Sequence, residues 1–591
     1  MKNRLIATAL AAVMLLGLAA CGGTGTGTTT PTTKQDADAT TAADATTTAA
    51  DETDSQPKEL VTLQVFSMPS NTSGLQDNSY WAEILKRDLN VQIELLPAGD
   101  EAVTKMASLM ASQSLPDIVV FKDHTTYVSD AIEANMIINL DEHKDALPNV
   151  FANASMALQF MRDSVSFGTG NAYAVPTGVT NQVSKAGSIV GPYLRWDLYT
   201  ELGMPAVKDI EDYLPILKDM LELEPTNQEG QPNYGISIFD DWDGSVSWPV
   251  RIISEMYGVT QDGLYFMEHN INDGSLKSIY EDDSYFKRAI KFYYQANQMG
   301  VMDPDLITDT FDDYAAKASA GRSLFQLYNW TSWGYENAET MESGRTYLSV
   351  YFDNERQIAP APSYVGGASG DAWFAISSTS KNVDAALSFL DYVYSYDGLW
   401  NLAWGDQGIA WDIGADGKPY RTELGWEMKN DQKPFENGGM IAEGLNSMNA
   451  FGMPWTVVHP VYGARMDELD WTKADFAPAS YDVEIDWQTK MNANDDLDYV
   501  FKNGLYVEKP FAPQLPPLEG DLGDLKLIAD ALAAENKVAT YKMIVAKDDA
   551  EFDALWSALV ATAEEIGVAE LDAWVADQFA ISAAEGAQYM Y

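Results

Sequence analysis

Strand-like and helix-like patterns alternate along the chain from Leu60 onward. Residues 60–66 (LVTLQVF) have the composition of a strand, and residues 79–90 (SYWAEILKRDLN) place apolar side chains on one helical face. Two more strands are predicted at residues 91–96 and 118–121, and between them residues 103–110 have helical spacing. Strands that alternate with helices predict βαβ units and a mainly parallel sheet. The apolar positions behind the two helix predictions are Trp81, Ile84, Leu85 and Leu89, and Val103, Met106, Ala107 and Met110.

The first twenty residues have the order of a secretory signal peptide. Lys2 and Arg4 precede an apolar run from Leu5 to Leu18, which is short for a stable membrane span, and small residues follow. The sequence LAAC that ends at Cys21 resembles the lipobox of bacterial lipoproteins. That resemblance implies cleavage before Cys21 and a lipid on its sulfur and on the new N-terminus. An ordinary signal peptide that happens to contain a cysteine is the alternative.

Residues 21–59 contain no large apolar side chain and consist mostly of Thr, Ala, Gly and Asp. Such a segment cannot offset its ordering entropy by burial, so we expect a disordered tether. No cysteine follows Cys21, which excludes internal disulfides and thiolate metal sites. The formal net charge of −51 repels nucleic acid and anionic membrane surfaces, so we expect neither a nucleic-acid partner nor membrane contact other than the lipid anchor.

Residues 80–121 resemble the opening of family 1 extracellular solute-binding proteins, the lipoprotein receptors of bacterial ABC sugar importers. Further segments follow in the order that the family leads one to expect. They are GNAYAVPTG, YLRWDLYTELGMPAVKDIEDYLPILKDM, SYFKRAIKFYYQANQMGVMDPDL, AAKASAGRSLFQLYNW and AWFAISSTSKNVDAALSFLDYVYSYDG. The resemblance covers residues 60–417 well and the remainder more loosely.

The resemblance implies a two-lobed α/β fold with a ligand cleft between the lobes. The implied division is a signal peptide (1–20), a lipidated tether (21–59), a discontinuous N-terminal lobe (60–187 and 345–415) and a discontinuous C-terminal lobe (188–344 and 416–591). It also implies a monomeric, non-enzymatic receptor without a cofactor, which delivers an oligosaccharide to ABC permease subunits. Its place would be the extracellular face of the bacterial cytoplasmic membrane. A surface carbohydrate-active hydrolase and a glycan-binding lipoprotein without a transporter are the alternatives.

Sugar rings have an apolar face that suits aromatic side chains and a hydroxyl edge that suits carboxylates and amides. Tryptophan beside aspartate at strand ends, where ligands of α/β sheets bind, therefore indicates a sugar site. Trp330 also resembles a tryptophan that stacks on sugar in maltose-binding relatives. Each aromatic candidate has the alternative of packing within its own lobe. The ligand-binding candidates are Asp123, Asp241, Trp242, Trp248, Trp330, Trp333, Asp371 and Trp373.

Other motifs are weaker or have a structural explanation. Trp400 and Trp404 lie four apart on a predicted helix, which favours a core pair, and Trp411 stays open. Residues 412–423 partly match an EF-hand calcium loop, but the third position is Gly414 and the Asp-Gly pair also favours a hairpin turn. The four histidines lack zinc-ligand spacing, and we expect no metal site. A glycosidase carboxylate pair stays open because carboxylates are numerous.

Overall fold

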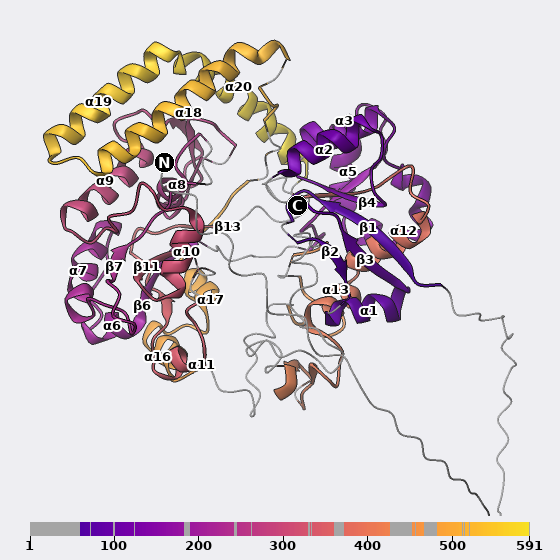
Figure 1. Ribbon diagram of the computed structural model, residues 1–591, viewed down its shortest axis with the longest axis horizontal. Coiled ribbons are helices and arrows are strands. Elements are labelled where there is room, and N and C mark those ends of the chain that lie inside the picture. The colour runs from indigo at the N-terminus through magenta and orange to yellow at the C-terminus, as the bar shows by residue number, and fades with distance from the viewer. Residues whose placement is uncertain are drawn as a thin grey trace, which may run out of the picture. The chain divides into compact units, whose positions relative to one another are not determined.

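The computed structural model describes most of the chain from Glu59 to Tyr589 (Figure 1). The part before residue 59, including Cys21, lies outside the described residues. The segments left out within this range are 183–189, 242–244, 360–371, 426–451 and 466–480, with positions 71, 78, 99–100, 123, 262, 329–330, 332–333, 416, 455–456, 511, 513–514 and 519. Among the described residues, no helix combines the length and the apolar character needed to cross a membrane.

The first sheet contains the three strands predicted from the sequence, and they run parallel as predicted. Val61 of β1 lies opposite Val91 of β3, and Val65 of β1 lies opposite Ile118 of β4. All four residues of β4 are buried, as is typical of a strand covered on both faces. The order is β2-β3-β1-β4-β14-β5, with bounds Gly74–Gln76, Val91–Leu95, Val61–Ser67, Ile118–Phe121, Trp373–Ile376 and Ala174–Pro176.

Two predicted helices flank this sheet. In α1 (Tyr80–Leu89) the predicted face is confirmed, because Trp81, Ile84 and Leu85 are buried. In α2 (Ala102–Ala111) only Met106 is buried, and Val103 is exposed. The other helical elements of this part of the chain are η2 (His124–Val128), α3 (Ser129–Glu133), η3 (Leu140–Ala146), α4 (Pro148–Asn153), α5 (Ser155–Phe160) and η4 (Met161–Val165).

The apolar core around this sheet, here named the first core, also receives segments from much later in the chain. β14 inserts between β4 and β5, and α12 (Val383–Val393) and α13 (Tyr396–Trp404) follow it into the core. Trp400 and Trp404 are buried there, which confirms their prediction as core residues. Trp411 is buried as well, and its indole N–H donates to the Gly405 carbonyl at 2.9 Å.

A second sheet forms between residues 190 and 349 and lies in what we name the second core. β11 pairs with β7 in parallel and with β6 antiparallel, and β12 pairs antiparallel with β6. A small antiparallel sheet, β10-β9-β8, belongs to the same part of the chain. The strands are β6 (Val190–Arg195), β7 (Tyr234–Ile236), β8 (Val259–Thr260), β9 (Met267–Asn270), β10 (Ser275–Ser278), β11 (Ser323–Tyr328) and β12 (Tyr347–Ser349).

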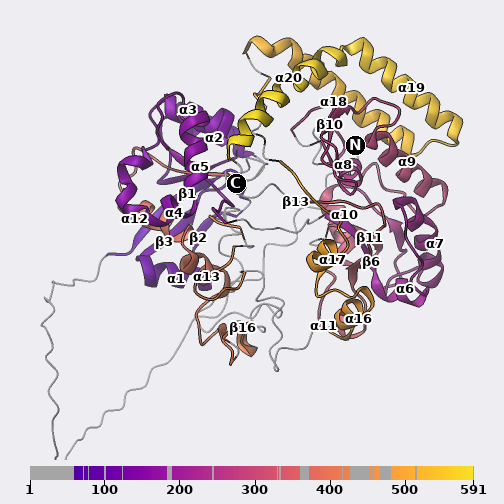
Figure 2. The ribbon, with the colours of Figure 1, turned by 180° about the vertical axis from the view of Figure 1, so that it is seen from behind.

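Helices from the middle and the end of the chain complete the second core. The three long C-terminal helices α18, α19 and α20 contact one another and contribute buried residues to it (Figures 1 and 2). The helices are α6 (Trp196–Glu201), α7 (Tyr213–Leu223), α8 (Trp248–Glu255), α9 (Tyr285–Gln298), α10 (Phe311–Ser319), α11 (Ala338–Glu342), α16 (Asp482–Met491), α17 (Asp496–Lys502), α18 (Gly523–Ile544), α19 (Asp549–Ile566) and α20 (Val568–Gly586). A strand pair, β13 (Gln357–Ala359) with β17 (Tyr506–Glu508), runs parallel.

Two segments lie in a different core from the one that the sequence-based division gives them. β12 pairs with β6 in the second sheet, beyond residue 345, where that division resumes the N-terminal lobe. Met453, Val457 and Ala464 pack in the first core, although the division assigns residues 416–591 to the C-terminal lobe. The physical reason is that strand pairing and apolar contacts decide core membership, whereas the division followed chain position in the family.

Candidate functional site

The first candidate surface lies where β4 ends. Ligands of α/β sheets bind beyond the carboxyl ends of the strands. Trp373, the first residue of β14, pairs with Phe121, the last residue of β4, so the antiparallel register brings a predicted binding residue to this end of the sheet. His124 begins η2 three residues after β4 ends. The fold thus places a tryptophan and a histidine beside one strand terminus.

Three rings meet there and are named here the strand-end ring cluster: His124, Phe160 and Trp373. The His124 ring centroid lies 5.1 Å from that of Trp373 and 5.8 Å from that of Phe160, and the Phe160 and Trp373 centroids are 6.5 Å apart. Trp373 is only 2% exposed. The described structure therefore packs this ring within its own lobe, which was the alternative interpretation of the residue. Its role as a ligand contact stays a prediction.

The indole of Trp373 has its polar atom buried. The Trp373 indole N–H makes no hydrogen bond within the described part of the protein. A buried donor that is left unpaired costs about 1–3 kcal/mol. The indole N–H groups of Trp81, Trp400 and Trp404 are in the same condition, so this feature does not by itself distinguish Trp373.

The second candidate surface lies at the carboxyl ends of β7 and β11. These two strands are parallel, so the residues that follow them leave the same edge of the sheet. After β7 the chain reaches Asp241, whose Oδ1 accepts the Phe311 backbone N–H at 2.7 Å. That bond satisfies one of the free N–H groups in the first turn of α10. One of the two carboxylate oxygens of Asp241, a residue predicted as a ligand contact, thus caps the N-terminus of α10.

Trp248 opens α8 and is only partly buried. Its indole N–H donates to the Tyr328 hydroxyl at the end of β11, and the Arg251 guanidinium lies 4.1 Å from its ring centroid. Arg251 in turn bonds Glu255 one turn later at 2.8 Å. Burial, followed by the neighbouring Tyr314, raises the pKa of Tyr328, so its hydroxyl stays protonated. The ring of Trp248 is therefore held in place at one edge and on one face, as a stacking surface requires.

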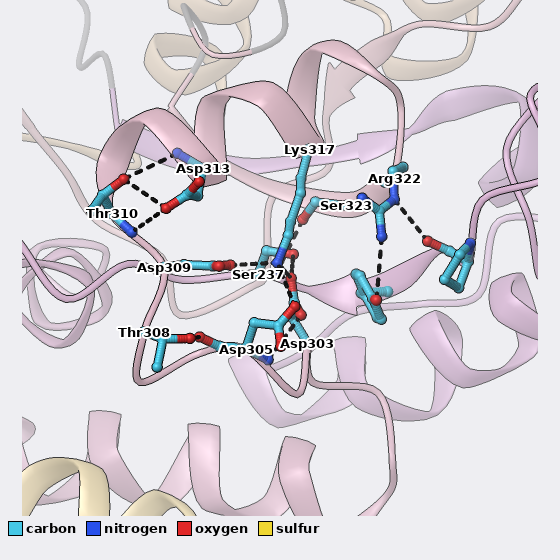
Figure 3. A network of polar contacts seen from close by, with 12 residues as sticks. Ser237, Asp303, Asp305, Thr308, Asp309, Thr310, Asp313, Lys317, Arg322 and Ser323 are labelled. Carbon is cyan, nitrogen blue, oxygen red and sulfur yellow. Dashed lines mark hydrogen bonds and ion pairs between the residues drawn. The ribbon is translucent and has the colours of Figure 1, made fainter. Parts of the chain in front are cut away.

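A buried ionic network joins the residue after β7 to α10 (Figure 3). The Lys317 ammonium of α10 donates to Asp303 at 2.7 Å, to Asp309 at 2.5 Å and to Asp305 at 3.3 Å. Asp303 also accepts the Ser237 hydroxyl at 2.9 Å, directly after β7. These bonds tie the residues after β7 to α10.

The pKa values in this network reflect burial and pairing. Burial raises the pKa of Asp309, although the Lys317 ammonium opposes the shift. Burial lowers the pKa of Lys317, but its hydrogen bonds to Asp303 and Asp309 outweigh that effect, and the net shift is upward. The lysine is therefore charged at neutral pH, and it compensates the aspartates that surround it.

The remaining predicted site residues cannot be placed. Asp123, Trp242, Trp330, Trp333 and Asp371 lie outside the described residues, as does Cys21. Their assignments stay predictions. The structure brings Asp241 and Trp248 to the end of the β7 and β11 pair, and it brings Trp373 to the end of β4.

Several residues that shape the two surfaces were not predicted from the sequence. Tyr328 carried a usable signal, because it ends the strand that precedes Trp330. Arg251 also carried one, because it follows Trp248 by three residues and so shares its helical face. His124 carried a signal as well, because it follows the predicted strand at residues 118–121 by three residues. Phe160 had no such signal, since only the tertiary structure brings α5 to Trp373.

The segment that partly matches a calcium loop folds as a β-hairpin. β15 (Trp411–Ile413) pairs antiparallel with β16 (Pro419–Arg421), and Gly417 adopts a positive φ of 79° in the turn. This confirms the hairpin alternative, whereas an EF-hand requires a helix on each side of its loop. Across the described residues, no group of three or more His, Cys, Asp or Glu side chains is placed to hold a metal ion.

No family model matches the chain, and no curated protein matches it. Several solved structures do. An HMO-binding, ABC-transporter-associated solute-binding protein from Bifidobacterium longum infantis has 17% sequence identity and a TM-score of 0.54, and the match covers 89% of this chain and 99% of that one. The ABC-transporter substrate-binding protein FusA from S. pneumoniae, in complex with kestose, has 14% identity and a TM-score of 0.55 over 90% of this chain and 99% of that one.

A third match is the alginate-binding protein AlgQ2, with 16% identity and a TM-score of 0.54 over 88% of this chain and 98% of that one. At such low sequence identity the matches establish similarity of fold. Because they cover nearly the whole of each chain, the similarity holds for the complete fold and not for one part of it. All three are described as binding proteins rather than as enzymes. The protein has the mixed α/β fold of ABC-transporter solute-binding proteins.

Proposed function

We propose that the protein is a carbohydrate receptor that delivers an oligosaccharide to the permease of an ABC transporter. The observation that carries the proposal is the fold match over about nine-tenths of the chain to substrate-binding proteins of such transporters. The similar structures are named for HMO, kestose and alginate, which are all built from several sugar units. We therefore favour an oligosaccharide over a monosaccharide.

The chemistry of the second candidate surface supports a sugar ligand. Trp248 offers a partly exposed ring, and Arg251 and Tyr328 hold that ring in one orientation. An oriented ring suits the apolar face of a pyranose or furanose, and a carboxylate oxygen such as the Oδ2 of Asp241 suits a hydroxyl. Trp330 and Trp333 follow the strand that ends at Tyr328, so their sequence positions fit the same role.

In this proposal the lobes close around the ligand, and the permease recognises the closed form. Hinge closure of two lobes is a general mechanism of periplasmic binding proteins. We propose no catalytic step. A lipid on Cys21 would retain the protein at the extracellular face of the membrane, and residues 22–59 would give it reach. The lipobox-like sequence and the absence of any other cysteine support this anchor.

A thermal-shift screen tests the function. The probes are kestose, HMO preparations, alginate oligosaccharides and the corresponding monosaccharides. A ligand at a hundred times its dissociation constant stabilises the native state by about 2.7 kcal/mol, which such a screen detects. Calorimetry then gives the affinity, and chromatography of the recovered sugar detects cleavage.

Stabilisation by an oligosaccharide that is recovered intact supports the receptor. Cleavage of the sugar would instead establish the hydrolase alternative. A protein that binds no oligosaccharide in a broad panel but binds another class of solute would overturn the carbohydrate assignment.

A further inference from the structure

The helix α20 and the short 3-10 helix η10 (Ala587–Tyr589) that follows it together contact both cores. Val568, Leu571 and Val575 of α20 are buried in the second core, whereas Tyr589, three residues after the helix ends, is buried in the first core. The chain therefore has a helical connection between the two cores at its very end. Twenty-one residues separate Val568 from Tyr589, which corresponds to about 30 Å at 1.5 Å per residue.

Two aromatic contacts fix α20 on the second core. The Phe579 ring centroid lies 4.8 Å from that of His269 in β9, and the Trp574 ring contacts Tyr265 at 6.2 Å. Both contacts are edge-on, the geometry that ring quadrupoles favour. The helix is thus anchored on the second core as far as Phe579.

The other end of this segment contacts the first core. The Tyr589 ring meets Phe160 edge-on, with centroids 5.3 Å apart and planes at 81°. Its hydroxyl donates to Asp163 in η4 at 3.0 Å, and the Ser164 hydroxyl donates to the Glu585 carboxylate. Phe160 is one of the three members of the strand-end ring cluster. Tyr589 therefore contacts directly a ring that touches both His124 and Trp373.

We propose that Tyr589 is a positioning residue for the strand-end ring cluster, so that the C-terminus of the chain sets the orientation of His124 and Trp373. The relevance of this role to ligand binding rests on the proposed function. Phe160 has Tyr589 on one side and the other two rings of the cluster as further neighbours. Removing the tyrosine ring opens space beside Phe160, and a ring that gains space changes its position and its contacts.

The arrangement also implies linkage between the cluster and the C-terminal helix. If a bound ligand changes the position of His124 or Trp373, it also changes the contact between Phe160 and Tyr589. By thermodynamic reciprocity, a change in the position of Tyr589 then changes the affinity for the ligand.

Histidine NMR tests the positioning role without a ligand. The chain has four histidines, so selective labelling of the imidazole carbons gives a spectrum that four single-site variants can assign. His124 reports the first-core end of the segment, and His269 reports the second-core end through Phe579. His143 and His459 serve as references.

The variants are Tyr589→Ala, Tyr589→Leu, Tyr589→Phe and the matched control Phe579→Ala. We expect Tyr589→Ala and Tyr589→Leu to shift the His124 resonance by more than its line width and to leave His269 in place. Phe579→Ala should do the reverse, and Tyr589→Phe, which keeps the ring and loses only the hydroxyl, should give the wild-type His124 resonance. Tyr589→Leu retains apolar bulk. If Tyr589→Ala has a lowered melting temperature, the His124 resonance of Tyr589→Leu tests the positioning role instead.

An unchanged His124 resonance in both Tyr589→Ala and Tyr589→Leu would overturn the proposal, as would equal shifts of His124 in those variants and in Phe579→Ala. The ligand arm measures the affinity for kestose, or for the oligosaccharide that gives the largest thermal shift. We expect Tyr589→Leu to bind the sugar about fivefold or more weakly than wild type, and Tyr589→Phe to bind it with nearly wild-type affinity. That result would show that the position of Tyr589 also influences ligand binding. If no sugar binds, the proposed function fails while the NMR result still decides the positioning role.

Discussion

Replacing Lys317 by methionine removes one charge from the middle of the buried ionic network and keeps most of the apolar stem. The lysine side chain is 10% exposed, that of Asp303 is 0% exposed and that of Asp309 is 8% exposed. The variant leaves these two carboxylates close together without a compensating cation. Removing one partner of a buried ion pair typically costs about 3–5 kcal/mol, because the remaining charge stays desolvated. We expect a loss in that range at pH 7.

The loss should depend on pH in a definite direction. Burial already raises the pKa of Asp309, and removing the Lys317 charge raises it further. A carboxyl group whose pKa is higher in the folded state binds its proton at a pH where the unfolded chain has released it. The contribution of this carboxyl group to the free energy of unfolding therefore falls as the pH rises from its pKa in the unfolded chain to its pKa in the folded protein. Lys317→Met should accordingly lose less stability relative to wild type at pH 5 than at pH 7.

Urea denaturation at both pH values measures the effect, and Lys526→Met is the matched control. Lys526 pairs with Asp530 at 2.9 Å on α18, but the two side chains are 54% and 61% exposed. An exposed pair of this kind contributes less than about 1 kcal/mol. A loss for Lys317→Met as small as that of the control, or a loss that is the same at both pH values, would refute the view that the network is desolvated.

Four further predictions concern the anchor, two tryptophans and one carboxyl group. Cys21→Ala should release the protein into the medium or leave an unprocessed precursor, and fractionation that finds the processed variant still at the membrane would contradict lipidation. Trp404→Ala, which empties a core position, should cost about 3–5 kcal/mol with little change in sugar affinity. Trp330→Ala should weaken binding about tenfold or more, as calorimetry would detect, with an unaltered melting temperature. Burial raises the pKa of Asp496 from 3.8 to about 6, so its charged form destabilises the fold increasingly as pH rises from 4 through 6. Asp496→Asn should therefore stabilise the protein at pH 7 by up to about 3 kcal/mol, and a loss of stability in denaturant titration would count against this.

Local patterns of apolar residues were a good guide to the buried positions of single elements. The spacing of Trp81, Ile84 and Leu85 predicted the buried face of α1, and the apolar run at residues 118–121 predicted β4. The same reasoning gave Val103 a place on an apolar face, but Val103 is exposed, and α2 contacts the core through the buried Met106 and the partly buried Ala102, Leu109 and Met110. A helix at the margin of a core needs few apolar contacts, and its sequence pattern does not reveal how few.

The candidate site was harder to predict because its members come from distant parts of the chain. Trp373 lies near His124 only because β14 returns to pair with β4, and Tyr589 lies near Phe160 only through the course of α20. No local pattern encodes such a pairing. Trp248 and Asp241 were within reach because each lies close after β7 in the sequence, although their partners Tyr328 and Phe311 were not apparent.

The position of β14 in the first sheet has a consequence for the order of folding during synthesis. β4 and β5 are not neighbours, since β14 lies between them, and β14 begins only at residue 373. A ribosome has therefore made all four strands of the second sheet before the first sheet can close. Until then β4 has an unpaired edge, and such edges readily pair with those of other chains. The nascent first lobe must be kept apart from other chains for the time that it takes to synthesise some 250 further residues after β4.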